Sequence, residues 1–207
     1  RRDTAWRKRL KRYLNPGNGQ SLLDLAAGTG DVAFSLLKHT EPGKITRACG
    51  CDMAFNMLLT AQEKSIKKKT DHTVTFCQGD ASQIPFKEKA FDAVTMAFGI
   101  RNVPDPVHVL GGIRRVLVDK GKALILEFSL PKNRLIRWLH LFYLRRFIPL
   151  AGRIVSGDKR AYRYLNETIE TFPYGKDFCK LMEDAGFRDV RFHPLTFGVA
   201  TVYEGVK

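Results

Sequence analysis

Three aspartates stand at or just after the ends of three short apolar segments, where acidic side chains can bind a nucleoside. Asp24 lies near the end of the first segment, and Asp52 and Asp80 follow the next two. Carboxylate oxygens accept hydrogen bonds, so these residues can hold ribose hydroxyls or an adenine amino group. The small residues 26–30 come after the first segment, and such a turn lets a ligand approach the backbone closely. The pattern therefore predicts a nucleoside-binding site.

The sequence of the glycine turn argues against two common kinds of nucleotide-binding site. It reads Gly28-Thr29-Gly30, and Ala33 occupies the position where dinucleotide-binding proteins have a third glycine. The lysine of a phosphate-binding P-loop is missing as well. We interpret the glycines as making room for a ligand rather than as a cradle for pyrophosphate.

Each aspartate also has a purely structural interpretation. Asp24 could anchor the turn, Asp52 could cap the helix that follows it, and Asp80 could belong to a turn. Each of these interpretations is plausible alone. Because the aspartates occur together at three consecutive strand ends, we favour ligand binding.

The rest of the chain must bring these ends together, and its pattern predicts how. Apolar segments alternate with amphipathic stretches as far as residue 128, which is typical of right-handed crossovers in a parallel sheet covered by helices on both faces. Ligands bind such sheets at the carboxyl ends of the strands. The predicted strands are 21–25, 45–51, 73–77, 91–97, 122–128, 186–194 and 199–205, the last at or near an edge. The predicted helices are 4–14, 31–39, 54–68, 106–117, 160–172 and 176–185.

Composition limits the class of protein. The 207 residues are enough for one sizeable core, and the formal net charge of +14 favours acidic ligands, nucleic acid or anionic lipid surfaces as partners. No apolar run reaches the roughly 18 residues of a membrane span. The four cysteines show no zinc-binding spacing, so we expect buried, reduced thiols and no metal.

The turn and the aspartates together resemble a known family. Asp24-Leu-Ala-Ala-Gly-Thr-Gly30, Asp52 and Gly79-Asp80-Ala81, in this order, resemble the class I S-adenosylmethionine-dependent methyltransferases. The resemblance implies a Rossmann-like α/β fold with a seven-stranded, mostly parallel sheet, its last strand antiparallel. It also implies that the acid after the second strand holds the ribose and the acid after the third reads adenine. The cofactor-binding residues expected for S-adenosyl-L-methionine are Asp24, Ala26, Gly28, Thr29, Gly30, Asp52, Met53, Asp80, Ala81 and Ala97.

Further motifs resemble those of one particular family within this class. Phe98-Gly-Ile-Arg-Asn-Val103, Leu126-Glu-Phe-Ser-Leu-Pro131 and Tyr162-Arg-Tyr-Leu-Asn-Glu-Thr-Ile169 look like those of the ubiquinone/menaquinone biosynthesis C-methyltransferases, over nearly the whole chain. Members methylate a ring carbon of a polyprenylated quinol, which is demethylmenaquinol or a methoxy-polyprenyl-benzoquinol. The resemblance thus implies a C-methyltransferase of menaquinone or ubiquinone biosynthesis with a polyprenyl quinol as partner.

Some positions depart from this family. Ala97 stands where members commonly have serine, and Tyr203 stands where histidine is common near the C-terminus. The family's N-terminal cap segment is not found in the sequence. We expect one methyltransferase domain over residues 1–207, with a helical insertion at 130–172 on the substrate or membrane side. A homodimer is left open.

Quinol chemistry assigns roles to polar residues after the fourth strand. A ring carbon becomes nucleophilic when a neighbouring phenol ionises, and an ordinary phenol has a pKa of about 10. Arg101 is charged at neutral pH, so it can stabilise a phenolate, and Asn102 can orient the same oxygen. The alternative for Arg101 is a structural role, fixing its loop to a carboxylate. The expected substrate contacts are Phe98, Tyr162 and Tyr164, and for the two tyrosines aromatic core packing is the alternative.

The stretch 134–147 combines an apolar, aromatic face with a basic one, a pattern that suits a helix lying on an anionic membrane surface. Packing of that face on the domain itself is the alternative. We expect a cytoplasmic protein that can lie peripherally on the inner face of the membrane. No nucleic acid is expected as a partner, because the common RNA-binding modules are missing. The alternative functions are methylation of another lipid or small molecule, or a basic RNA-binding methyltransferase.

Overall fold

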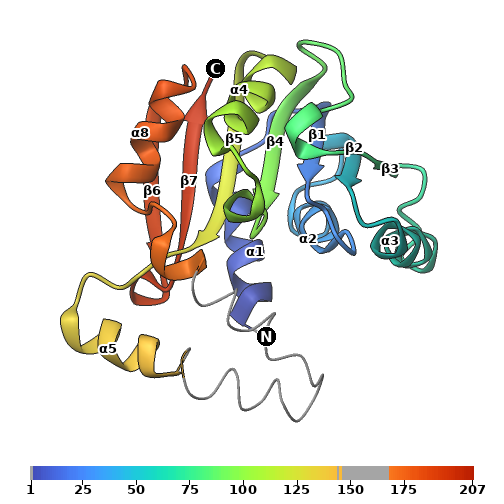
Figure 1. Cartoon of the computed structure of the whole chain (residues 1–207). Helices are drawn as coiled ribbons and strands as arrows, with labels where there is room; N and C mark the ends of the chain where they lie inside the picture. The colour runs from blue at the N-terminus through green and yellow to red at the C-terminus, as the bar shows by residue number, and fades with distance from the viewer. Residues whose placement is uncertain (1, 144, 146–167) are drawn as a thin grey trace.

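A computed structural model describes residues 2–143, 145 and 168–207. It contains a seven-stranded sheet in the order β3-β2-β1-β4-β5-β7-β6 (Figure 1). Neighbouring strands are parallel from β3 to β5, and β7 is antiparallel to both β5 and β6. The predicted fold is therefore confirmed. The strands are β1 (Gln20–Leu25), β2 (Ile45–Asp52), β3 (Val74–Gln78), β4 (Phe91–Ala97), β5 (Leu117–Phe128), β6 (Arg188–Leu195) and β7 (Ala200–Val206).

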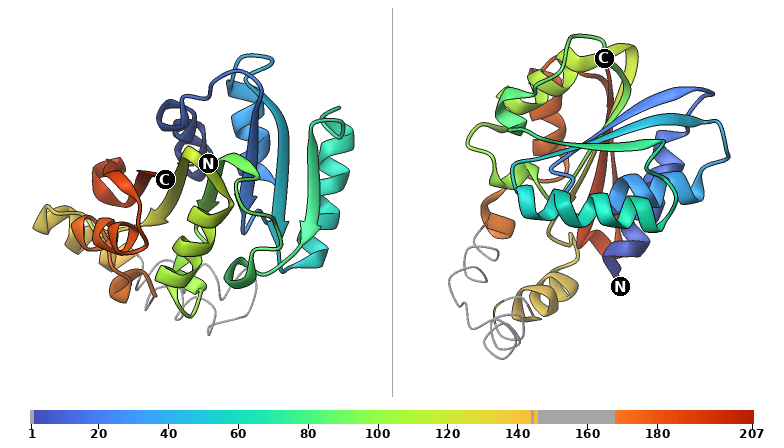
Figure 2. Two further views of the ribbon diagram at one scale, coloured as in Figure 1. Left: turned by 90° about the horizontal axis from the view of Figure 1, so that it is seen from above. Right: turned by 90° about the vertical axis from the view of Figure 1, so that its right-hand side faces the viewer.

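Helices cover both faces of the sheet (Figure 2). The connections from β1 to β2 and from β2 to β3 run in one direction along the sheet, and the connection from β4 to β5 runs in the other. Right-handed crossovers therefore place α2 and α3 on one face and α4 on the opposite face. α1 joins α2, and α8 joins α4. The described helices are α1 (Arg2–Leu14), α2 (Asp31–His39), α3 (Phe55–Lys67), α4 (Pro106–Val116), α5 (Arg134–Phe142) and α8 (Lys176–Asp184).

The strand order reverses between β1 and β4, which pair with each other in parallel. At such a switch point the loops that leave adjacent strands diverge to opposite faces and leave a crevice at the carboxyl ends. In Figure 1 these ends lie at the lower side of the sheet, toward α5. We call this edge the rim. β7 lies one strand in from the edge that β6 forms, which agrees with the position predicted for strand 199–205.

The basic first helix is buried along one side. Trp6, Leu10 and Leu14 share one face because they are four residues apart, and all three are buried against the sheet with Val202 of β7. On the opposite face, Phe178 of α8 packs on Tyr203 of β7, with ring centroids 4.4 Å apart. The sheet is thus buried on both sides, and its loops at the rim are held by a rigid core.

One predicted boundary was clearly wrong. β5 begins at Leu117 rather than at residue 122, because Leu117 already pairs with Phe91 and the register shifts before Ala93 meets Lys122. Residues 118–121, which lie between the predicted helix and strand, therefore belong to β5, with Lys120 at a φ of 64°. Most of the predicted helix 160–172 lies outside the described residues. Among the described residues, no helix is long and apolar enough to span a membrane.

Candidate cofactor and substrate site

The glycine turn after β1 has the backbone that its residues predict. Ala26, Gly28 and Gly30 have φ angles of 51°, 53° and 76°, in the left-handed region that favours glycine. Gly99, from the loop after β4, lies against the same turn, and a Cβ atom there would come within 2.7 Å of the Ala26 Cβ. Small residues are therefore required at positions 26 and 99, where the two loops touch.

Asp24 lies beneath this turn, with an exposed fraction of 1%. Its Oδ1 accepts a hydrogen bond of 2.7 Å from the Thr95 hydroxyl of β4, whereas its Oδ2 has no hydrogen-bond partner among the described residues. Burial raises the pKa of Asp24 to about 7, although the Thr95 hydrogen bond opposes the rise. Asp24 thus anchors β1 to β4, whereas its structural interpretation predicted an anchor for the turn.

Asp52 bridges two loops of the rim. Its Oδ2 accepts a hydrogen bond of 2.7 Å from the Gly28 amide, and its Oδ1 accepts one of 2.8 Å from the Ala54 amide. The N-cap residue of α3 is Ala54, so the prediction that Asp52 could cap this helix was wrong. Each carboxylate oxygen has a further lone pair, which leaves Asp52 able to accept from a ribose hydroxyl as well.

Asp80 and Met53 lie at the adenine end of the expected site. Asp80 caps the short 3-10 helix η1 (Ala81–Gln83), because its Oδ1 accepts a hydrogen bond of 2.8 Å from the Ser82 amide. Its interpretation as a turn residue is therefore confirmed, and its contact with adenine stays a prediction. Met53 follows Asp52 and is 65% exposed, and its contact with the cofactor also stays a prediction.

Lys64 of α3 clamps the glycine turn, a function that the sequence did not reveal. Its ammonium donates to the Thr29 hydroxyl at 2.8 Å and forms an ion pair of 2.9 Å with Asp31. The clamp joins two elements that follow different strands. Its only sequence signal is that Lys64 lies within a helix near other lysines, a pattern more typical of a solvated surface.

Arg101 lies in the short helix η2 (Ile100–Asn102) and is held by Glu127 at the end of β5. The Arg101 Nη1 to Glu127 Oε1 distance is 2.6 Å, and the two side chains are 9% and 1% exposed. Nη1 also donates to the Phe98 carbonyl at 3.0 Å, whereas Nε has no partner among the described residues. Burial raises the pKa of Glu127, and the charge of Arg101 opposes the rise. The structural interpretation of Arg101 is confirmed, and its catalytic role stays a prediction.

The remaining residues predicted to act on the substrate are Phe98, Asn102, Tyr162 and Tyr164. Phe98 has a φ of 58° and packs on Phe128 and Trp6, with ring centroids 4.6 and 6.1 Å apart. The side-chain amide of Asn102 donates to the Phe98 carbonyl at 3.4 Å. Tyr162 and Tyr164 lie outside the described residues.

All four cysteines are free thiols, as predicted, and three of them are buried, whereas Cys77 is only partly buried. Burial raises the pKa of Cys49 to about 12 and that of Cys51 to about 11. Within the described ranges, no group of three His, Cys, Asp or Glu side chains could hold a metal ion.

The residues at the rim fit S-adenosylmethionine. The Gly99 loop packs closely on the glycine turn at the switch point, and the buried Asp24 Oδ2 has no hydrogen-bond partner among the described residues beneath it. Asp52 and Asp80 present carboxylates after β2 and β3, and Ala97 ends β4 on the other side of β1. Sheet order, turn and acids together define a class I S-adenosylmethionine-dependent methyltransferase.

More specifically, the chain belongs to the ubiE/COQ5 methyltransferase family, whose model matches residues 1–207. It is 36% identical to the ubiquinone/menaquinone biosynthesis C-methyltransferase UbiE of Paracoccus denitrificans, over 98% of this chain and 80% of that protein. It is also 36% identical to the demethylmenaquinone methyltransferase of Bacillus cytotoxicus, over 100% of this chain and 86% of that protein.

Solved structures agree on the fold. A complex of the Haloferax volcanii Trm112 methyltransferase activator with a methyltransferase contains a chain that matches with a TM-score of 0.73 and 18% identity, over 99% of this chain and 90% of that one. A SAM-dependent methyltransferase from Aquifex aeolicus matches with a TM-score of 0.67 and 17% identity, over 97% of this chain and 88% of that one.

Proposed function

We propose that this enzyme methylates a ring carbon of a polyprenylated quinol, which is demethylmenaquinol or a methoxy-polyprenyl-benzoquinol. Relatives named for these reactions align over at least 98% of the chain, which supports a quinol as the substrate. In the structure, the observation that carries the proposal is the buried Arg101 in the loop after β4, which has one guanidinium N–H without a partner among the described residues.

The methyl donor and Arg101 have separate roles in the proposed reaction. When bound, S-adenosylmethionine supplies a methyl group on a positively charged sulfur, which a nucleophilic carbon can take. Arg101 makes the ring carbon more nucleophilic by stabilising an ionised neighbouring phenol with its positive charge. Asn102 orients the same oxygen from the exposed side of the loop. The ring carbon then loses its hydrogen as a proton, and Arg101 can polarise the water that accepts it.

Positioning supplies the larger part of the rate. Holding two reactants in a reactive alignment can contribute roughly 7–11 kcal/mol. The rim suits this task because its loops are fixed from below. Asp24 ties β1 to β4, Glu127 ties β5 to the loop after β4, and Lys64 ties α3 to the glycine turn.

We further propose that α5 brings the enzyme to the inner face of an anionic membrane, where a polyprenyl tail resides. Trp138, Leu139 and Phe142 form an exposed apolar face on this helix, with 61%, 51% and 46% of their surfaces accessible. Arg134 and Arg137 on the same helix are exposed and basic. Arg145 contributes less, because its guanidinium makes two hydrogen bonds with Glu170, at 2.6 and 2.9 Å.

A methyl-transfer assay tests the proposed function. The enzyme is incubated with S-adenosylmethionine labelled in the methyl group and with demethylmenaquinol or the benzoquinol, side by side, in mixed vesicles. We expect label in at least one quinol product and none in added RNA. Label in RNA or in another lipid, with neither quinol methylated, would overturn the assignment and favour the alternative functions.

A further inference from the structure

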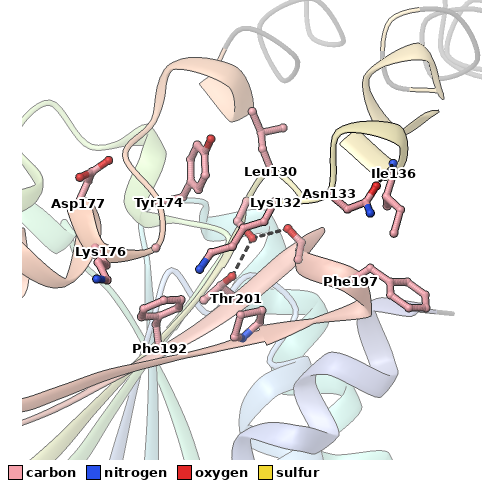
Figure 3. A pocket seen from close by; sticks show the side chains of 14 residues that line it. Leu130, Lys132, Asn133, Ile136, Tyr174, Lys176, Asp177, Phe192, Phe197 and Thr201 are labelled. Carbon is pink, nitrogen blue, oxygen red and sulfur yellow. Dashed lines mark hydrogen bonds between the residues drawn. The ribbon is translucent and has the colours of Figure 1, made fainter. Parts of the chain in front are cut away.

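A cavity lies farther along the rim from the expected cofactor site. It is a cavity of about 440 Å³ between the ends of β5, β6 and β7 and the beginnings of α5 and α8 (Figure 3). Figure 3 shows Tyr174 and Phe192 on one side of the cavity and Ile136 and Phe197 on the other. The apolar part of its wall is formed by Leu130, Ile136, Tyr174, Phe192, Pro194 and Phe197.

The cavity adjoins the Arg101 loop through the sheet. Thr201 lines the cavity and is the β7 partner of Glu127 in the antiparallel ladder. Paired residues of an antiparallel ladder have Cα atoms about 4.5–5.5 Å apart and point to the same face of the sheet. Because Glu127 holds the Arg101 guanidinium at 2.6 Å, the Arg101 loop and the cavity are separated by one pair of neighbouring residues of β5 and β7.

The two hydroxyls in the wall are already hydrogen-bonded. The Ser129 hydroxyl donates to the Gly198 carbonyl at 2.8 Å and shares a hydrogen bond of 2.8 Å with the Thr201 hydroxyl. The Lys132 ammonium lies 5.6 Å from the centre of the Phe192 ring, which also lines the cavity. A polar head group would find few free partners at this hydroxyl pair, whereas an apolar ligand leaves both hydroxyls hydrogen-bonded to each other.

The cavity opens toward the exposed apolar face of α5. Ile136 lines the cavity from one side of this helix, and Leu139 is 51% exposed one turn further along. Phe197, which lines the cavity at the η4 helix (Thr196–Gly198), is 80% exposed. A volume of this size encloses a small ligand, so a longer chain must continue along α5.

We propose that this cavity binds the isoprenoid tail of the quinol, taking the units nearest the ring and passing the rest to α5. This inference depends on the proposed function for the identity of the ring. It adds a binding site for the tail, with Ile136 and Phe197 as residues that determine tail specificity.

Substitution of Ile136 tests the proposal. Ile136→Trp fills the cavity from a helix that has no buried residue, so the core is not disturbed. We expect it to raise the KM for demethylmenaquinol with a long tail about tenfold relative to the KM for the same ring without a tail. Leu59→Trp on α3, at a site that is 49% exposed, is the matched control and should leave this ratio unchanged. An unchanged ratio in Ile136→Trp would overturn the proposal.

Direct binding separates the cavity from the reaction. Geranylgeraniol has the tail without the ring, and its binding is measured by equilibrium dialysis. We expect the wild-type protein and Leu59→Trp to bind it and Ile136→Trp to bind at least fivefold more weakly. Equal binding by all three proteins contradicts the cavity assignment. If no quinol is methylated but this pattern holds, the proposed function fails and the cavity remains an isoprenoid site.

Phe197 provides a second variant that keeps the fold. Its φ of 59° lies in the left-handed region, which asparagine tolerates better than most residues. Phe197→Asn therefore removes the exposed ring at the opening of the cavity without straining the backbone. We expect it to weaken geranylgeraniol binding severalfold, and wild-type binding would count against the opening being the route of the tail.

Discussion

Asp52 has two roles at the residue scale, which substitutions can separate. It fixes two loops through the amides of Gly28 and Ala54, and it is placed to accept from a ribose. Asp52→Asn keeps one acceptor oxygen and loses the other, so we expect S-adenosylmethionine binding to weaken about tenfold, or ~1.4 kcal/mol. Asp52→Ala should weaken it further. Calorimetry measures both, with the exposed loop residue Asp71→Asn as control. Unchanged affinity in Asp52→Ala would remove the ribose assignment.

Asp24 makes stability depend on pH. Its pKa in the folded protein is about 7, above its ordinary value of 3.8. Between these values the folded state binds more protons than the unfolded state, so stability falls as pH rises from about 4 to about 7. At about 1.4 kcal/mol per pH unit, the loss is on the order of 4 kcal/mol.

Asp24→Asn should remove this contribution. Urea unfolding of both proteins without cofactor, at pH 4.5 and pH 7.5, measures the effect. Asparagine leaves a buried amide without a partner, which lowers stability equally at both pH values, so the comparison is between slopes. We expect a shallower decline with pH in the variant. Equal slopes would mean that Asp24 does not titrate in this range.

Arg101 requires a test that separates chemistry from structure. Arg101→Met leaves Glu127 buried and unpaired, which typically costs 3–5 kcal/mol of stability. Adding Glu127→Gln removes the unpaired charge, so the double variant should regain most of this stability. If Arg101 contacts the quinol, turnover of the double variant stays at least a hundredfold below wild type while S-adenosylmethionine affinity is retained. Recovery of turnover together with stability would limit Arg101 to positioning the loop.

At the scale of elements, the alternation of apolar and amphipathic segments predicts the sheet and most helices, since burial on two faces leaves few other arrangements. The residue pattern within one segment does not indicate which distant segments it contacts. β5 starts early because Leu117 pairs with Phe91, and no property of residues 117–121 alone indicates that pairing. The contacts of Lys64 and Glu127 at the rim could not be predicted for the same reason, because their partners belong to other elements. The acids and glycines are different, because each lies at a strand end that sequence can locate.

The first helix illustrates how an element with a basic sequence is stabilised by its apolar side. Leu10 has no exposed surface and packs between α1 and the sheet. Leu10→Ala should therefore lower the free energy of unfolding by about 2–5 kcal/mol, through lost burial and the cavity left behind. Lys11→Ala, at an exposed position of the same helix, should change it by less than about 0.5 kcal/mol. Denaturant unfolding measures both, and equal effects would contradict the packing of this helix on the core.

At the scale of the whole molecule, the parts of the site follow one another along the rim. The cofactor crevice lies where β1 and β4 diverge, the Arg101–Glu127 pair lies at the ends of β4 and β5, and the apolar cavity follows at β7 and β6. α5 continues from the cavity with an exposed apolar face. A membrane on the α5 side would therefore deliver the tail first and the ring last, so a substrate need not leave the lipid completely to reach the methyl donor.

Vesicle binding tests this arrangement. Trp138→Ser and Leu139→Ser together remove much of the apolar face of α5, while the net charge of +14 is retained. We expect sedimentation with anionic vesicles to fall severalfold, because both apolar burial and charge are needed for stable attachment. Leu59→Ser on α3, which removes one exposed leucine elsewhere, should sediment as wild type does. Binding that depends only on the anionic lipid and not on α5 would show that the positive charge alone attaches the protein, and the substrate would then require another route to the rim.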